Sequence, residues 1–158
     1  DIDKTLIELS SPNDNDIMGD DYIIKQIEKY GHETQLILIS AINYYNGHYY
    51  DIESISKIAK EYNCILGLDI AHAAGNVKLF LHDWNIDFAV WCGYKYLNGG
   101  PGAPGGAFIH SNHLKNIEIN RLEGWWGHDK NSRFELLKRF IPSNTAESWQ
   151  LSNPPILC

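Results

Sequence analysis

The sequence is poor in the residues that mark metal-binding and disulfide-rich proteins. Of its 158 residues, three are cysteines and one is methionine. Cys64, Cys92 and Cys158 lack the paired spacing of a zinc site. Cys64 and Cys92 stand inside apolar runs, where a cysteine is more typical of a reduced core than of a disulfide. The seven histidines have no second ligands at zinc-site spacing. We therefore predict no metal site, and the cytoplasm is the compartment that fits best.

The sequence also lacks long hydrophobic runs and an excess of basic residues. No apolar run approaches the roughly 20 residues of a membrane span, and no basic segment precedes an apolar one as in a signal peptide. There are 13 Lys and Arg residues against 20 Asp and Glu residues, which gives a formal net charge of −7. An acidic chain without a basic stripe is a poor partner for nucleic acid. We expect no membrane and no nucleic-acid partner.

What the sequence does contain is an alternation of helical and strand patterns. Between residues 20 and 30 apolar residues recur at steps of three and four, and Gly31 follows as a stop signal. Asp51 is expected to cap a second helix, whose apolar stripe extends to Tyr62. Residues 83–86 form a short helix or a turn.

Apolar runs predict the strands at residues 35–40, 64–68, 88–92 and 107–109. The order strand, helix, strand is that of a βαβ unit. The sequence therefore predicts an α/β fold with a mostly parallel sheet flanked by helices. From about residue 112 onward the pattern is irregular.

Polar residues follow three of the predicted strands. Ser40 and Asp69 close the first two, and Tyr94 and Lys95 come just after the third. Open sheets of this type bind ligands at the carboxyl ends of their strands. The convergence of these residues at one edge is stronger evidence for a site than any one of them.

An amine and a carboxylate at neighbouring strand ends suit an enzyme that uses pyridoxal phosphate. Lys95 is the candidate for the Schiff base with the cofactor, and burial beside a positive charge would favour its neutral amine. Asp69 is the candidate partner of the protonated ring nitrogen. Taken singly, Lys95 is as readily an ordinary surface lysine, and Asp69 a cap of the segment that follows it.

The other candidates have ordinary structural alternatives that spacing leaves open. His72 either lies against the cofactor or is structural, and Tyr94 is a phosphate ligand, a general acid/base or a rim tyrosine. Ser40 is a weak candidate hydrogen-bond donor. The glycine-rich segment 98–106 lacks the Lys-Ser/Thr ending of a phosphate-binding loop. We interpret it as a tight backbone passage beside Lys95.

Several motifs resemble the kynureninases. The similarity begins at about Leu36 and continues to the last residue, with long motifs in the right order. These motifs occupy residues 69–76 (DIAHAAGN), 81–84 (LHDW), 94–98 (YKYLN), 106–110 (GAFIH), 124–128 (GWWGH) and 152–156 (SNPPI).

The resemblance implies a fold-type-I pyridoxal phosphate enzyme of the aspartate aminotransferase superfamily, working as a homodimer. Residues 1–158 are then an internal fragment of the cofactor-binding large domain, with an N-terminal part and a C-terminal small domain missing. The implied reaction hydrolyses L-kynurenine, or its 3-hydroxy analogue, to anthranilate or 3-hydroxyanthranilate and L-alanine. Such a fragment is expected to be inactive alone.

The resemblance also implies roles for single residues. Lys95, Tyr94 and Asp69 are the implied catalytic residues, and a contact to the cofactor or substrate is implied for each residue of a larger set. That set is Ser40, Asp69, His72, Tyr94, Lys95, Trp125 and Asn153, with Trp125 reaching across the dimer interface.

Two other functions remain open at this stage. A cysteine desulfurase usually has a histidine directly before the lysine, where this chain has Tyr94, and it needs a catalytic cysteine that none of the three is well placed to be. A non-catalytic remnant that keeps the fold is the other alternative, and the presence of Asp69, Tyr94 and Lys95 argues against it.

Overall fold

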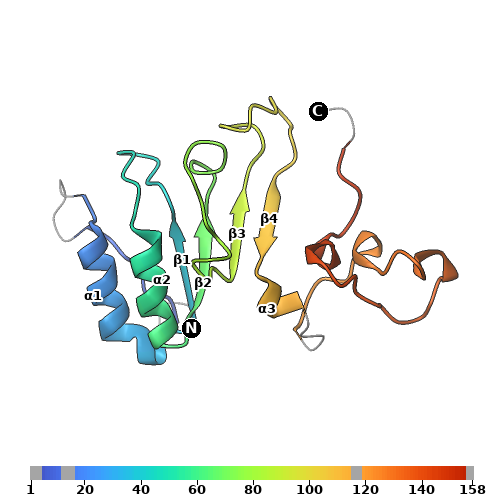
Figure 1. The fold of residues 1–158 in the computed structure, drawn as a ribbon, viewed down its shortest axis with the longest axis horizontal. Helices are drawn as coiled ribbons and strands as arrows, with labels where there is room; N and C mark the ends of the chain where they lie inside the picture. The colour runs from blue at the N-terminus through green and yellow to red at the C-terminus, as the bar shows by residue number, and fades with distance from the viewer. Residues whose placement is uncertain (1–4, 12–16, 115–118, 156–158) are drawn as a thin grey trace.

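Four strands form a single sheet in which chain order and spatial order agree. The computed structural model describes residues 5–11, 17–114 and 119–155. Strands β1 (Leu36–Ser40), β2 (Ile65–Asp69) and β3 (Phe88–Trp91) are parallel, and β4 (Gly106–Ile109) pairs with β3 in the antiparallel sense (Figure 1). The predicted α/β fold with a mostly parallel sheet is confirmed, and each predicted strand is within one residue of its observed position.

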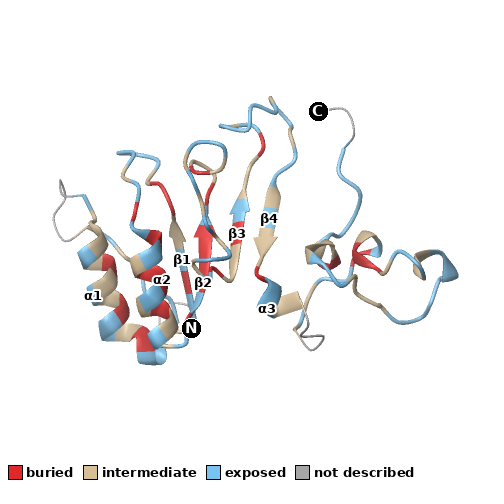
Figure 2. Ribbon diagram, in the orientation of Figure 1, coloured by how far each residue is buried: buried red, intermediate tan, exposed pale blue. Residues whose placement is uncertain are grey.

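Two amphipathic helices, α1 (Asp20–Tyr30) and α2 (Ile52–Glu61), pack together against one face of the sheet. Their apolar stripes meet the alternate residues of the strands that point the same way, and these side chains are buried (Figure 2). The core is formed by Ile23 and Ile27 of α1, Ile52, Ile55 and Ala59 of α2, and Ile37, Leu66, Leu68 and Ala89 of the strands. Burial of apolar surface here stabilises the sheet edge that carries the polar residues.

The ends of the helices test two predictions from the sequence. Asp51 caps α2 as predicted, because its carboxylate accepts a hydrogen bond from the Ser54 backbone N–H at 3.1 Å. Gly31 follows the last residue of α1, as its prediction as a stop signal requires, and with a φ of −57° it begins a 3₁₀ turn, η2 (Gly31–Glu33). A β-carbon at Gly31 would lie 2.5 Å from the Tyr62 ring, so close packing explains the glycine.

The opposite face of the sheet is apolar, and no helix of the described residues packs on it. Leu36, Leu38, Ile65 and Val90 point to this face in register and are 50, 61, 37 and 43% exposed. Parallel sheets are ordinarily covered on both faces. We refer to these four residues as the open face.

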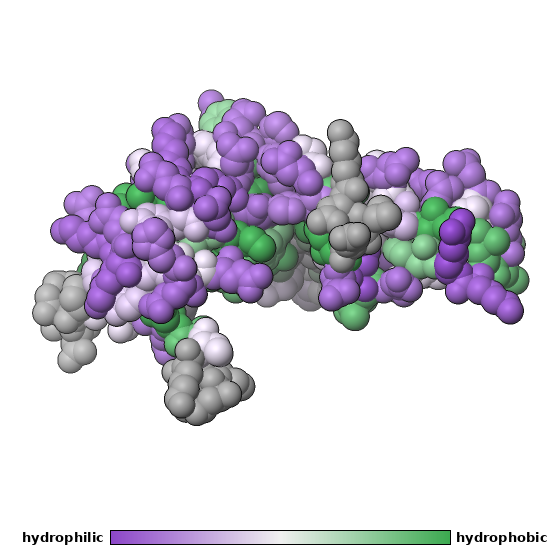
Figure 3. Space-filling view, turned by 90° about the horizontal axis from the view of Figure 1, so that it is seen from below, coloured by the Kyte–Doolittle hydropathy of each residue, from purple (hydrophilic) through white to green (hydrophobic). Residues whose placement is uncertain are grey.

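The chain beyond β4 is built from short turns. After the short helix α3 (Ser111–Leu114) come the 3₁₀ turns η3 (Trp125–Gly127), η4 (Arg133–Glu135) and η5 (Ala146–Trp149). This C-terminal region lies beside β4 (Figure 1), and hydrophobic residues show on its far end in the space-filling view (Figure 3). Phe134 and Leu136 are 80 and 81% exposed there. The irregular pattern predicted beyond residue 112 is confirmed.

The connection between β2 and β3 contains turns at residues 71–76 and 81–85, so the expected feature at 83–86 is a turn and not a helix. Among the described residues, no helix combines the length and the hydropathy that crossing a membrane requires.

Candidate functional site

The carboxyl ends of three parallel strands bring the predicted polar residues to one edge of the sheet. Ser40 ends β1 and Asp69 ends β2, and the two are register partners, so their side chains leave the same face. Lys95 follows β3, four residues after its last residue Trp91. The edge predicted from the sequence therefore exists, at the upper ends of the β1, β2 and β3 arrows (Figure 1).

Asp69 presents a carboxylate to solvent at this edge. Its Oδ1 accepts a hydrogen bond from the Ala71 backbone N–H at 2.8 Å, which holds the side chain against the turn that follows. None of the described residues donates a hydrogen bond to its other oxygen, Oδ2. One carboxylate oxygen thus remains available to a cationic N–H group.

His72 and Lys95 come together from two different loops. The Lys95 Nζ lies 3.0 Å from the His72 Nε2, and both side chains are half-buried. An amine nitrogen always carries hydrogens, so Nζ donates when Nε2 is unprotonated. The turn that starts with Ala71 brings His72 across from β2, and Asn76 Nδ2 donates to the His72 carbonyl at 3.0 Å. The contact therefore links the turn after β2, the strand that ends in Asp69, to the loop that carries Lys95.

Aromatic rings surround the pair. The Tyr94 ring centroid lies 5.9 Å from Lys95 Nζ, and the Tyr94 side chain is 55% exposed. The rings of Tyr44 and Tyr96 lie 6.5 and 6.3 Å from the His72 ring. Tyr44 and Tyr96 were not among the residues predicted from the sequence. For Tyr44, the sequence offers one signal, a pair of tyrosines directly before Asn46-Gly47, a dipeptide typical of turns.

The glycine-rich segment after Lys95 is a tight backbone passage, as its sequence predicts. A β-carbon at Gly93 would lie 2.3 Å from the Pro104 carbonyl oxygen, and the Gly99 N–H donates to the Gly93 carbonyl at 3.0 Å. Gly100 and Gly102 have φ of +77° and +83°, which side chains other than glycine rarely adopt. The segment therefore fixes the backbone on which Tyr94 and Lys95 stand.

Trp125 and Asn153 lie in the C-terminal region, and none of their described contacts is with Asp69, His72 or Lys95. The Trp125 Nε1 donates to the Arg133 carbonyl at 3.3 Å, and the indole is 48% exposed. Asn153 is exposed. Their roles at the site remain predictions.

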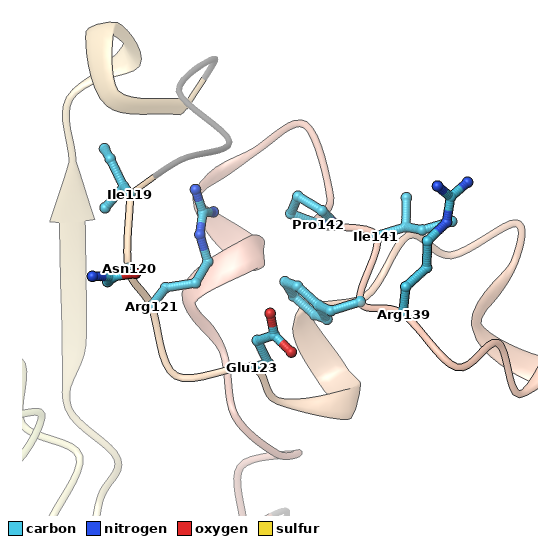
Figure 4. A pocket seen from close by; sticks show the side chains of 8 residues that line it. Ile119, Asn120, Arg121, Glu123, Arg139, Ile141 and Pro142 are labelled. Carbon is cyan, nitrogen blue, oxygen red and sulfur yellow. The ribbon is translucent and has the colours of Figure 1, made fainter.

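A cavity of about 470 Å³ lies in the C-terminal region and not at the strand ends. Figure 4 shows Glu123 between the Arg121 and Arg139 side chains, and Phe140 also lines the cavity. Arg121 donates to the Ser148 hydroxyl at 2.9 Å. The residues that line this cavity include no lysine, histidine or cysteine, so it offers neither a side-chain amine nor a thiol.

The described part of the chain offers neither a cluster of metal ligands nor a reactive thiol at Cys64. No three His, Cys, Asp or Glu residues within it are grouped to hold a metal ion. Burial raises the pKa of the Cys64 thiol, which donates to the Thr34 carbonyl at 3.2 Å. Such a thiol is a poor nucleophile because the thiolate is disfavoured. Cys92 is half-buried at the end of β3, and Cys158 lies outside the described residues.

Residues 11–122 match the family described as aminotransferase class-V. Across 99% of this chain and 34% of the relative, the sequence is 45% identical to a kynureninase of Nematostella vectensis. It is 46% identical to a kynureninase of Myxococcus xanthus, across 97% of this chain and 36% of that one. It is 47% identical to a protein named kynureninase 1 of Aspergillus oryzae, across 96% of this chain and 33% of that one. The chain thus spans about a third of the length of the curated relatives it matches.

Solved structures share the fold at low sequence identity. A cysteine desulfurase from Thermococcus onnurineus superposes with a TM-score of 0.64 and 21% identity, over 83% of this chain and 31% of that one. An alanine–glyoxylate aminotransferase from Nostoc gives a TM-score of 0.57 and 17% identity, over 85% of this chain and 37% of that one. These likenesses concern the arrangement of strands and helices.

Proposed function

Because this chain belongs to the aminotransferase class-V family, whose members depend on pyridoxal phosphate, we propose that it forms part of a kynurenine-hydrolysing enzyme. The proposed reaction converts L-kynurenine, or its 3-hydroxy analogue, and water into anthranilate or 3-hydroxyanthranilate and L-alanine. The observation that carries the proposal is the meeting of Lys95 with His72, three residues beyond Asp69, at the edge where the parallel strands end. The choice of kynurenine as the substrate rests on the relatives named kynureninase, which match nearly all of this chain.

The residues at this edge fit the cofactor. Pyridoxal phosphate offers an aldehyde for an amine, a basic ring nitrogen for a carboxylic acid and a phosphate for hydrogen-bond donors. The Lys95 amine, the Tyr94 hydroxyl and the Asp69 Oδ2, to which no described residue donates, match these groups one by one. Ser40 and His72 are the neighbouring hydrogen-bonding residues. When bound, the cofactor supplies a sink for the electrons released at the substrate Cα.

Each side chain then has a defined task. Lys95 would hold the cofactor through its side-chain amine, and in the reaction the same amine takes up the substrate Cα proton and returns it. Asp69 would lie against the ring nitrogen of the cofactor as its hydrogen-bond partner. Tyr94, whose ring borders Lys95, delivers a proton to the substrate Cβ. His72 accepts a hydrogen bond from Lys95 and so orients the amine.

The overall change is a hydrolysis whose atoms balance without any oxidant. Water adds to the carbonyl carbon Cγ of the substrate, and the bond between Cβ and Cγ breaks. The hydroxyl of water remains on Cγ as part of the carboxyl group of anthranilate. A proton goes to Cβ, which becomes the methyl group of L-alanine.

We propose further that the active unit is longer than these 158 residues and is a homodimer. The relatives are about three times as long, and the open face needs a cover that the described residues do not provide. On this view residues 1–158 are part of the cofactor-binding large domain. Trp125 and Asn153 complete the site from the C-terminal region, Trp125 across the subunit interface. A buried, reduced Cys64 suits the cytoplasm.

The alternatives fit less well. A desulfurase needs a reactive thiolate, and the burial that raises the pKa of Cys64 opposes one. A non-catalytic remnant has no need of Asp69, Tyr94 and Lys95 together at one edge. The kynureninases are also more similar in sequence than the solved desulfurase, at 45% against 21% identity.

The function is tested by replacing Lys95 in the longer protein. The unaltered protein is expected to release anthranilate from L-kynurenine, followed by the fluorescence of the product. Lys95→Ala is expected to lower kcat by about 10³-fold or more, because the proton at Cα loses its acceptor. Lys95→Arg is expected to be as inactive, since a guanidinium stays protonated.

Lys57→Ala is the matched control, because Lys57 is an exposed lysine on α2 that pairs with Glu53 at 2.7 Å. It should retain the full rate. Release of anthranilate by Lys95→Ala at an undiminished rate would remove Lys95 from the mechanism. No release by the unaltered protein would refute the proposed function.

A further inference from the structure

An exposed tyrosine, Tyr44, stands beside the His72–Lys95 pair and is not used by the chemistry proposed above. The Tyr44 side chain is 79% exposed, yet its ring centroid lies 6.5 Å from that of His72, with 32° between the ring planes. His72 in turn is 3.0 Å from the Lys95 amine. The Tyr44 ring therefore neighbours the imidazole that contacts the Lys95 amine, and it offers most of its surface to a ligand.

The turn that carries Tyr44 is held by hydrogen bonds. The Asn43 Oδ1 accepts from the backbone N–H groups of Tyr45 and Asn46 at 2.9 and 3.3 Å. The Gly47 N–H donates to the Asn43 carbonyl at 2.9 Å, and Gly47 has a φ of +75°, which its missing side chain allows. An aromatic side chain on such a turn loses little conformational freedom when a ligand binds.

A further hydrogen bond connects the end of this turn to the segment that carries His72. The Tyr49 hydroxyl donates to the Lys78 carbonyl at 3.0 Å. Burial raises the pKa of Tyr49, and the Asp51 charge raises it further, so the hydroxyl keeps its proton and remains a donor. Tyr44 and His72 are therefore held at a set separation by two loops that are bonded to each other.

We propose that Tyr44 is one wall of the substrate site and stacks on the aryl ring of an aromatic amino acid substrate. The inference rests on the proposed function and deepens it by naming a residue that selects the substrate. Asp69 and Lys95 offer polar partners to the cofactor, whereas none of the residues assigned above is a partner for the aryl ring of the substrate. An exposed aromatic ring beside the histidine that contacts the reactive amine supplies that partner, because stacked rings bury apolar surface and favour an offset arrangement.

The test compares three variants of the longer protein. Tyr44→Ala is expected to raise the KM for L-kynurenine by about tenfold and to change kcat by less than about threefold. Tyr44→Phe keeps the ring and should stay within about twofold of the unaltered protein in KM. Tyr45→Ala is the matched control, since Tyr45 is the next residue on the same turn, is 88% exposed and has no ring contact among the described residues.

A binding measurement separates this inference from the proposed function. Anthranilate carries the aryl ring alone, and its fluorescence reports binding without turnover. Tyr44→Ala should weaken anthranilate binding by about tenfold, while inhibition of the reaction by L-alanine, which lacks the ring, should not change. If the unaltered protein binds anthranilate but does not hydrolyse L-kynurenine, the proposed function fails while Tyr44 is still tested.

Three results would overturn the inference. One is an unchanged affinity of Tyr44→Ala for anthranilate, and another is an equal loss in Tyr45→Ala. The third is a loss of bound cofactor from Tyr44→Ala with an unchanged KM in the protein that remains loaded, which would place Tyr44 against the cofactor instead.

Discussion

At the residue scale, a carboxylate with three hydrogen-bond donors among the described residues, that of Asp87, lies at the opposite end of the sheet from the site. The Asp87 carboxylate accepts hydrogen bonds from Lys60 Nζ, from the Leu66 N–H at 2.7 Å and, through its other oxygen, from His113 Nε2 at 2.7 Å. The Asp87 side chain is 12% exposed. These bonds tie α2, β2 and α3 to the start of β3.

Asp87→Asn is expected to lower the free energy of unfolding by about 2 kcal/mol, because it leaves Lys60 and the Leu66 N–H with a neutral, weaker acceptor. Urea unfolding followed by circular dichroism measures the change. Asp83→Asn is the control, since the Asp83 side chain is 78% exposed, and it should stay within about 0.5 kcal/mol. Equal midpoints for the two variants would contradict this account.

The same cluster predicts how stability depends on pH. Burial alone would raise the pKa of Asp87, but the bonds from Lys60, Leu66 and His113 outweigh it and hold the pKa below its ordinary value of 3.8. A carboxyl group with a lowered pKa in the folded state stabilises the protein fully above its unfolded value and loses that effect as pH falls through its folded value. The advantage of the unaltered protein over Asp87→Asn should therefore shrink on acidification below about pH 3.8.

At the element scale, the loop between β3 and β4 positions the reactive amine. Gly93→Ala would place a β-carbon 2.3 Å from the Pro104 carbonyl oxygen, a backbone atom that cannot turn aside. The loop must then shift and carry Lys95 away from His72. We expect kcat/KM for L-kynurenine to fall by about 10²-fold, as small displacements of catalytic groups do.

Gly19→Ala is the control for this substitution. A β-carbon at Gly19 meets nothing within 4 Å, and its φ of −86° suits any residue. That variant should keep its activity. Gly93→Ala with normal activity and a normal yield of bound cofactor would show that the loop tolerates a side chain there.

At the scale of the whole molecule, the open face predicts how these 158 residues behave alone. Leu36, Leu38, Ile65 and Val90 are all more than a third exposed on one side of the sheet. The isolated chain is therefore expected to bind a hydrophobic dye such as anilinonaphthalene sulfonate strongly. It should also hold no lysine-linked pyridoxal phosphate after dialysis and should not hydrolyse L-kynurenine. The longer protein, treated in the same way, is the control and should show the opposite behaviour.

Robust turnover by the isolated chain would show that the site needs neither a further segment nor a longer subunit. Weak dye binding would show that the open face is covered in solution, for instance by association of two copies through it.

What the sequence by itself determined is local. Periodicity of apolar residues set α1, α2 and the four strands, because burial selects the face of each element, and Asp51 was identifiable as a cap. Lys95 and Asp69 were identifiable because strand ends in a parallel sheet share an edge. Their functional roles came from the resemblance and are still to be tested.

Only the tertiary structure decided which loops meet at that edge. The contact of His72 with Lys95, the place of Tyr44 beside them and the close packing that requires Gly31 all join residues from separate segments. The Asp87 cluster likewise draws on residues between 60 and 113. Spacing along the chain carries no information on such contacts between distant segments. They depend on how the loops fold back over the core, and the core exists only when the sheet and helices have packed together.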